Sequence, residues 1–246
     1  MPPNSKTSAG TRKRASSPLK NTYLLAYNAL SAALWAGVLY KTVTIGANEV
    51  ISAGKNGWFT SGEPPLSALQ KGLGSGKVYD ELEEYTRLTQ SLAGLEVLHS
   101  ILGIVRAPLL TTLMQVASRF LLVHLIATPY AFPSTTRLSP AYSTMLLAWS
   151  FTEVVRYSYF VFNLSGIGVP RLWTWLRYNT FLVLYPLGVA SECWLVYSAI
   201  PAASKKNEYY GYALWAVLAV YVPGFYVLFT HMLNQRGRVM REGRKA

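Results

Sequence analysis

The chain has 246 residues, of which 51% are hydrophobic and only 14% charged, a balance that excludes an ordinary soluble domain and is typical of a membrane protein. Much of its net charge of +12 lies in two basic tails, and no basic groove with interleaved aromatic residues accompanies them, which argues against nucleic-acid binding. The single cysteine, Cys193, excludes an intramolecular disulfide framework and a cysteine-based zinc cluster.

Both ends of the chain are basic tails. Residues 1–21 are rich in Ser, Pro, Lys and Arg and contain no apolar run, which predicts a disordered segment and not a cleaved signal peptide. Residues 234–246 form the second basic tail. Because Lys and Arg flank membrane spans preferentially on the cytosolic side, we expect both tails in the cytosol.

Six apolar stretches between the tails are each long enough to cross a bilayer, which takes about 20 residues. The sequence therefore predicts an all-α, polytopic membrane domain over residues 22–233, with six transmembrane helices in a bundle. The predicted spans are Tyr23–Ile45, Leu88–Val105, Leu109–Tyr130, Ala141–Asn163, Tyr178–Ile200 and Tyr209–Met232.

A long polar connection, residues 46–87, separates the first two spans. Its charged residues, its Pro64-Pro65 pair and its glycine-rich centre predict a solvent-exposed loop on the non-cytosolic face, with a short helix near Tyr79–Arg87. The same topology puts the segment at Arg171–Arg177 in the cytosol. Asn163, in an Asn-Leu-Ser sequon, then also lies on the cytosolic side, and we expect it to stay unglycosylated.

Two motifs resemble catalytic signatures but lack their essential residues. The segment 72–77 has Lys71 and Val78 where a P-loop needs glycine and Ser or Thr, which favours a flexible loop. The segment 99–106 has the outline of the tyrosine-phosphatase signature, but Ser100 stands where the nucleophilic cysteine should be. Neither segment is therefore expected to be catalytic.

A metal site is also disfavoured. Glu96-x-x-His99 matches half of a di-iron carboxylate site, which needs a second such motif on a facing helix. The three histidines of the chain are not clustered in the sequence. We expect His99 to be a hydrogen-bonded polar residue that faces other helices.

Glu153 and Arg156 are three residues apart on one predicted helix face, which predicts an ion pair inside the bundle. A structural role for this pair is favoured over direct catalysis. Arg119 and Arg177 are expected to reach the membrane interface by extending their side chains along apolar surface.

Tyr185 and Glu192 are the strongest candidates for chemistry, because an ionisable residue inside an apolar span is costly and marks a functional site. Seven residues bring both side chains to nearly one helix face, about 10 Å apart along the axis. Pro186 lies between them and removes a helix hydrogen bond, so the local geometry can bring them closer. The alternative is that both are polar residues hydrogen-bonded to neighbouring helices.

These residues also carry a family resemblance, which extends from about Tyr23 to about Met240. The chain resembles the very-long-chain 3-hydroxyacyl-CoA dehydratases, also called protein-tyrosine-phosphatase-like proteins. The segments that carry the resemblance are Leu109–Thr112, Gln115–Arg119, Ala148–Ser150, Glu153, Arg156–Tyr157, Leu176–Tyr178, and the Tyr185-Pro186-x-Gly188 run that ends in Ser191–Glu192.

The resemblance implies a six-span protein of the endoplasmic reticulum that converts 3-hydroxyacyl-CoA to trans-2-enoyl-CoA. This is the third step of the fatty-acid elongation cycle, which feeds very-long-chain fatty acid and sphingolipid synthesis. The catalytic roles fall on Tyr185 and Glu192, and no cofactor is implied. The expected partners are the acyl-CoA substrate, the membrane and other elongation-cycle enzymes. The expected supporting residues are Glu153, Arg156, Arg177 and Tyr178.

Dehydration needs a base for the proton on C2 and an acid for the hydroxyl that leaves C3. A desolvated carboxylate suits the first role, so Glu192 is the expected base and Tyr185 the expected acid; the reverse assignment stays open. Arg171 and Arg177 can meet the CoA phosphates or anchor the chain to the membrane surface. The alternative function is a non-catalytic lipid-binding scaffold or a transporter.

Overall fold

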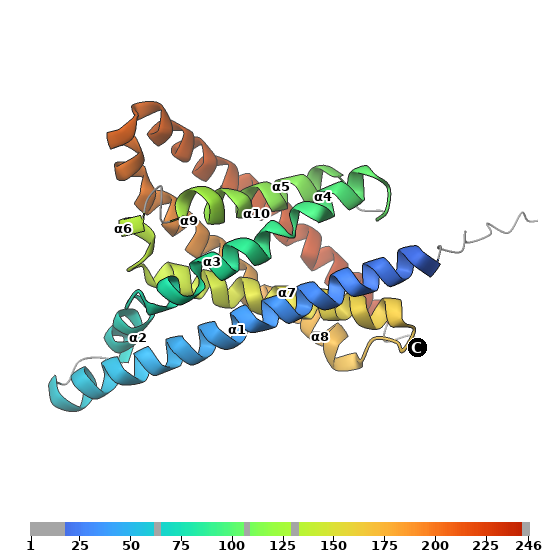
Figure 1. Cartoon of the computed structure of the whole chain (residues 1–246), viewed down its shortest axis with the longest axis horizontal. Helices are drawn as coiled ribbons and strands as arrows, with labels where there is room; N and C mark the ends of the chain where they lie inside the picture. The colour runs from blue at the N-terminus through green and yellow to red at the C-terminus, as the bar shows by residue number, and fades with distance from the viewer. Residues whose placement is uncertain (1–17, 62–64, 106–108, 129–132, 243–246) are drawn as a thin grey trace, which may run out of the picture.

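The computed structural model describes residues 18–61, 65–105, 109–128 and 133–242, and within these ranges the chain is helical and contains no strand. The prediction of an all-α fold is therefore confirmed. Residues 1–17, which make up most of the predicted disordered tail, and residues 106–108 lie outside the described residues. Residues 18–21 of that tail are helical and begin α1, so the prediction of disorder is wrong for them. The helices, drawn in Figure 1, are α1 (Pro18–Ser61), α2 (Pro65–Leu73), α3 (Lys77–Ser91), α4 (Gly94–Ile101), α5 (Leu109–Leu121), the π-helical turn η1 (Leu122–Ile126), α6 (Pro133–Thr136), α7 (Pro140–Ser165), α8 (Arg171–Asn179), α9 (Phe181–Lys206) and α10 (Glu208–Glu242).

Three of the described helices are long and apolar enough to cross a bilayer. They comprise residues Pro18–Lys55, Phe181–Lys206 and Glu208–Arg241, and a shorter apolar helix covers Thr112–Ile126. α7 has 26 residues, but Glu153 and Arg156 lower its hydropathy. Length and composition thus mark a membrane protein with three candidate spans.

The prediction of a loop over residues 46–87 is wrong. α1 continues through this segment to Ser61, and its 44 residues make it about 66 Å long, more than twice the roughly 30 Å hydrocarbon core. α2 then packs back on α1, where a Cβ on Gly72 would lie 2.5 Å from the Cα of Val50. The close packing of α2 on α1 thus requires glycine at position 72, whereas the sequence had predicted a flexible loop over residues 72–77. The short helix expected near Tyr79–Arg87 is present within α3.

The glycine-rich turn between α2 and α3 has a structural explanation as well. Gly76 adopts φ +88° directly before α3, a conformation that favours glycine. The amine of Lys77 binds Glu49 at 2.6 Å. The P-loop-like segment therefore connects two helices and ties α3 to α1.

The predicted span Leu88–Val105 is not one α-helix. α3 ends at Ser91, and i to i−3 hydrogen bonds at Leu92, Ala93, Leu95 and Glu96 form a tighter turn that leads into α4. The helical segment begins at Lys77, eleven residues before the predicted span. Hydropathy missed this start because the first half of α3 is polar on its exposed side.

The last three predicted spans agree better with the helices. α7 (Pro140–Ser165) extends the prediction 141–163 by one residue at its start and two at its end. Residues 178–200 are divided between the end of α8 and α9, and α9 continues to Lys206 with Pro186 and Pro201 inside it. α10 extends to Glu242, so the described part of the basic tail 234–246 is helical.

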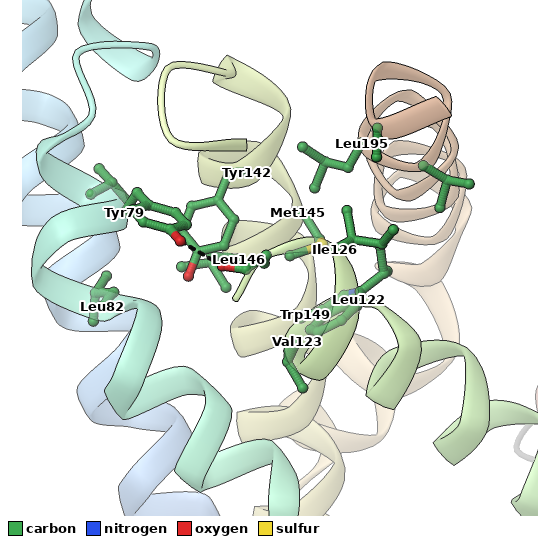
Figure 2. Close-up of a cluster of buried hydrophobic side chains, with 14 of the residues drawn as sticks. Tyr79, Leu82, Leu122, Val123, Ile126, Tyr142, Met145, Leu146, Trp149 and Leu195 are labelled. Carbon is green, nitrogen blue, oxygen red and sulfur yellow. Dashed lines mark hydrogen bonds between the residues drawn. The ribbon is translucent and has the colours of Figure 1, made fainter. Parts of the chain in front are cut away.

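The core forms around α7, which packs against α1 on one side and α9 on another. Figure 2 shows the α7 side chains Tyr142, Met145, Leu146 and Trp149 in this core. They pack with residues of α3, with residues of η1 and with Leu195 of α9. The hydroxyl of Tyr79 donates to the carbonyl of Ala127 at 2.6 Å, which fixes the end of the π-helical turn. This packing holds Trp149 beside α9, the helix that carries Tyr185 and Glu192.

Candidate active site

The carboxylate of Glu192 is buried on α9 and held from two other helices. The indole nitrogen of Trp149, on α7, donates to Oε1 at 2.8 Å, and the hydroxyl of Tyr221, on α10, donates to Oε2 at 2.9 Å. Each oxygen accepts one of these bonds and keeps a further lone pair. The side chain is therefore oriented and desolvated, and it still has capacity to exchange a proton.

Tyr185 lies on the same face of α9 and is half-buried. Its ring stacks on Phe225 of α10, with centroids 5.3 Å apart and planes 11° apart, and on Phe229 at 6.1 Å. The described residues include no hydrogen-bond partner for its hydroxyl. Tyr221, Phe225 and Phe229 are spaced four residues apart on α10 and therefore share one helix face. That face of α10 contacts both Tyr185 and Glu192. The phenol is thus fixed through its ring, and its hydroxyl is available to a ligand.

Gly188 lies on α9 between these two side chains, where α9 packs against α7. It is one turn after Tyr185 and one turn before Glu192, and a Cβ at this position would lie 3.9 Å from Oε1 of Glu192 and 3.6 Å from Ala148 Cβ. Gly188 is buried and these distances are ordinary van der Waals contacts, so the glycine lets α7 pack closely against α9 beside the carboxylate of Glu192.

A cluster of ion pairs joins α4, α5 and α7. Glu153 accepts hydrogen bonds from Arg119 of α5 and, at 2.7 Å, from Nε of Arg156. Arg156 also donates to both oxygens of Glu96 on α4, at 2.7 and 3.1 Å, and the Tyr157 hydroxyl donates to Glu96 at 2.6 Å. The predicted Glu153–Arg156 pair is confirmed, as part of a larger cluster that joins α4, α5 and α7.

The expectation that Arg119 extends to the membrane interface is wrong. Its guanidinium pairs with Glu153, whose side chain is 3% exposed, and lies 5.0 Å from the ring centroid of Trp149. The ring that stacks under Arg119 therefore belongs to the same side chain that donates to Glu192. Trp149 connects the ion-pair cluster to the candidate catalytic carboxylate.

Arg177 and Tyr178 lie on α8, and no described contact joins them to Tyr185 or Glu192. The guanidinium of Arg177 stacks over Tyr159 at 4.5 Å and Phe160 at 5.0 Å. Interactions with rings on α7 therefore hold Arg177 at the α7–α8 corner. Two polar residues of α9 and α8 also make structural bonds: Ser191 with Thr144 at 2.8 Å, and Asn179, which accepts from Arg236 at 3.0 Å.

His99 binds the hydroxyl of Tyr23 through Nε2 at 2.8 Å and packs edge-on against Tyr27. It has the expected position of a hydrogen-bonded residue between helices. Glu96, its neighbour in the considered di-iron motif, is bound by Arg156 and Tyr157. In the described ranges, no group of three or more His, Cys, Asp or Glu side chains could hold a metal ion.

Two small cavities flank the candidate residues. One, of about 320 Å³, is lined by residues of α7, α8 and α9, among them Trp175, Asn179 and Leu184. The other, of about 230 Å³, is entirely apolar and lies between Met114 of α5 and the Val220–Leu228 face of α10. The helix faces that carry these cavities adjoin the face with Tyr185 and Glu192.

Tyr221 was missed by the sequence analysis. A tyrosine within an apolar span is common, and only the packing of α10 against α9 places its hydroxyl on Glu192. Trp149 was noted as part of a motif without a role. The available signal was that a buried indole N–H requires an acceptor, and the nearest buried acceptor is on another helix.

Comparisons with known proteins agree on one family. The family model described as protein tyrosine phosphatase-like protein (PTPLA) matches residues 90–242. A probable very-long-chain (3R)-3-hydroxyacyl-CoA dehydratase of Schizosaccharomyces pombe is 38% identical over 227 residues, which cover 91% of this chain and 95% of that protein. Very-long-chain (3R)-3-hydroxyacyl-CoA dehydratase PASTICCINO 2 of Arabidopsis thaliana is 34% identical, with 93% and 97% covered, and hpo-8 of Caenorhabditis elegans is 33% identical, with 91% and 97% covered. No solved structure matches the chain.

Proposed function

The chain belongs to the protein tyrosine phosphatase-like family of very-long-chain (3R)-3-hydroxyacyl-CoA dehydratases, and we propose that Tyr185 and Glu192 are its catalytic pair. The protein is a lyase that removes water from a very-long-chain 3-hydroxyacyl-CoA, the dehydration step of fatty-acid elongation. The alternative of a non-catalytic scaffold or transporter is not favoured, because the relatives are named dehydratases.

The observation that supports the site is the environment of Glu192. In the proposed reaction Glu192 takes the proton from C2, the C2–H electron pair forms the C2=C3 bond, and the C3–O bond breaks. Tyr185 gives its proton to the leaving hydroxyl, so water departs, and proton return from Glu192 to Tyr185 restores the site. Donation from Trp149 and Tyr221 orients the carboxylate for this transfer.

In this mechanism the reacting C2–C3 bond lies between Tyr185 and Glu192. Gly188 lies between the acid and the base along α9, where it packs against Ala148 of α7. The stacked Phe225 and Phe229 keep the phenol of Tyr185 from rotating away. Both reacting groups are therefore positioned before the substrate binds, which lowers the entropic part of the barrier.

The test is turnover of a long-chain 3-hydroxyacyl-CoA by purified protein, followed as enoyl-CoA formation. Tyr185→Phe and Glu192→Gln should each lower kcat by about 10²- to 10⁴-fold, the usual contribution of a general acid or base, while the thermal unfolding midpoint stays within a few degrees. Matched controls are Tyr226→Phe, at a tyrosine that is 70% exposed, and Glu208→Gln, at the exposed start of α10. Near-normal turnover by either active-site variant would refute the pair.

We further propose six spans, formed by α1, α3 with α4, α5 with η1, α7, α9 and α10. The three apolar helices support this assignment, and ion pairing among α4, α5 and α7 offsets the charges that lower the hydropathy of α7. In Figure 1 the first turn of α1, α8 and the C-terminal end of α10 lie toward the same end of the molecule, which supports termini on one side of the membrane. The basic residues near both termini favour the cytosol as that side.

We also propose the endoplasmic reticulum membrane as the location and other elongation enzymes as partners. The support is chemical: a 3-hydroxyacyl-CoA must come from reduction of a 3-ketoacyl-CoA, and the enoyl product must be consumed by a second reduction. Enzymes in the same membrane would pass such poorly soluble thioesters efficiently. The elongation cycle then supplies very-long-chain fatty acids and sphingolipids. The proposed partners are tested by affinity capture of the detergent-solubilised protein, which should also recover reductases.

A further inference from the structure

Five arginines lie on α8 and the last two turns of α10, where Glu242 is the one acid beside them in the sequence. No Asp or Glu occurs between Glu153 and Glu192, or between Glu208 and Glu242. We call this set the basic corner; it comprises Arg171, Arg177, Arg236, Arg238 and Arg241.

The basic corner differs from the rest of the described chain in its ion pairing. Among the described residues, no carboxylate pairs with any of its five arginines. In contrast, the arginines at positions 87, 119, 137 and 156 all bind carboxylates. Even with Glu242 beside Arg241, five arginines leave the corner with a net positive charge, which favours an external anion.

Two arginines of the corner are held in place by uncharged neighbours. Nε of Arg236 donates to Oδ1 of Asn179 at 3.0 Å, which leaves the two terminal nitrogens of its guanidinium for a ligand. The guanidinium of Arg177 stacks on Tyr159 and Phe160. Planar guanidinium groups that are oriented in advance favour bidentate binding of phosphate.

The corner is also the right distance from the candidate catalytic pair. Asn179, which binds Arg236, lines the cavity of about 320 Å³ together with Leu184, the residue before Tyr185. Tyr185 and Glu192 lie four and eleven residues past the start of α9 at Phe181, so about 6 and 16 Å along the helix axis. An extended pantetheine arm can span this distance.

We propose that the basic corner binds the 3′-phosphate and diphosphate of the acyl-CoA substrate, an inference that rests on the proposed dehydratase function. Arg236 and Arg177 contact the phosphates, Asn179 positions Arg236, and the pantetheine arm passes the α8–α9 cavity toward Tyr185 and Glu192. Anionic lipid headgroups offer the same phosphate chemistry, so the test has to separate the two sources.

The test compares two substrates that share one 3-hydroxyacyl group, the CoA thioester and the pantetheine thioester, which lacks the nucleotide. Arg236→Gln and Arg177→Gln should each raise KM for the CoA thioester about tenfold or more, the effect of one charge-assisted contact, with little change in kcat. KM for the pantetheine thioester should not change. Arg236→Lys should recover part of the affinity, and Lys205→Gln, at the opposite end of α9, is the charge-matched control.

Adenosine 3′,5′-bisphosphate should inhibit the wild-type protein competitively and inhibit Arg236→Gln less. An equal loss on both thioesters, or no change in KM, would overturn the proposal. It would also be overturned if the effect of Arg236→Gln appeared in phosphatidylserine vesicles and vanished in phosphatidylcholine vesicles, because the corner would then bind lipid headgroups. Absence of wild-type turnover with both thioesters would instead refute the dehydratase function itself.

Discussion

The ion pairs among Glu96, Arg119, Glu153 and Arg156 predict which double variants of this cluster are stable. The cluster has two arginines, Arg119 and Arg156, and two glutamates, Glu96 and Glu153, so it is neutral. In Glu153→Gln the volume is kept, but Arg119 loses its only described carboxylate, while Arg156 keeps both bonds to Glu96. One unpaired positive charge then stays inside the bundle.

The size of the effect follows from burial. Breaking a buried ion pair costs about 3 to 5 kcal/mol. The Glu153 side chain is 3% exposed, but Arg119 is 24% exposed and can rehydrate in part, which favours the lower value of about 3 kcal/mol. For a chain of this length 1 kcal/mol corresponds to roughly 2–4 °C, so Glu153→Gln should lower the unfolding midpoint by about 6–12 °C.

Two double variants separate the cluster from an isolated pair. Arg119→Gln with Glu153→Gln leaves the bidentate Arg156–Glu96 pair intact and should recover most of the stability. Glu153→Gln with Arg156→Gln leaves both Arg119 and Glu96 unpaired and should recover none. An isolated Glu153–Arg156 pair, which the three-residue spacing suggests, would give recovery in the second double variant and not in the first.

The stabilities of these variants are ranked by the thermal unfolding midpoints of the detergent-solubilised proteins. Unfolding is monitored by a thiol-reactive or intrinsic fluorescence signal. The reasoning fails if Glu153→Gln with Arg156→Gln unfolds at a higher temperature than Arg119→Gln with Glu153→Gln. A Glu153→Gln protein of full stability and no turnover would place Glu153 in the chemistry.

Three further predictions address the carboxylate, the helix packing and the topology. Tyr221→Phe keeps the ring but removes one hydrogen bond to Glu192, worth about 1.5 to 3 kcal/mol for a charged acceptor, so kcat should fall roughly 10- to 100-fold at unchanged KM. Gly72→Leu should lower expression and the unfolding midpoint, because its side chain would overlap the backbone at Val50. In microsomes, Asn163 should stay unglycosylated, whereas a sequon engineered into α2 should be modified.

Each of these has a result that would contradict it. Unchanged kcat in Tyr221→Phe would mean that its bond does not orient the carboxylate. A stable Gly72→Leu protein would show that α2 can move away from α1 at little cost. Glycosylation at Asn163 would put the α7–α8 corner on the non-cytosolic side, away from soluble acyl-CoA.

The sequence predicted helices well where hydropathy and helix ends coincide. α7 and the start of α10 are within one or two residues of the predicted bounds. The predicted end of α1 was wrong because hydropathy indicates only where a helix could leave the bilayer. Nothing in residues 46–61 forces the helical hydrogen bonding to stop, so the helix continues to Ser61. The part of α1 after Ile45 packs against α2, and no local sequence pattern indicates this packing.

The candidate site divides in the same way. Tyr185, Glu192 and the Glu153–Arg156 pair share a helix face, so a spacing rule can identify them. The partners of Glu153 and Arg156 on other helices are 34 and 60 residues away in the chain, and Tyr221 is 29 residues from Glu192. Such contacts depend on how helices pack, which one sequence without relatives does not encode locally.

The ion-pair cluster also constrains how the protein assembles in the membrane. In the proposed six-span arrangement, α7 carries a glutamate and an arginine that no apolar neighbour can satisfy, so as a lone segment in lipid it would be poorly retained. Its charge partners, Glu96 on α4 and Arg119 on α5, both precede it in the chain and are synthesised first. During biogenesis α7 can therefore partition out of the translocation channel together with helices that already wait beside it, and variants at Glu96 or Arg119 should be expected to lose protein to degradation before any substrate is bound.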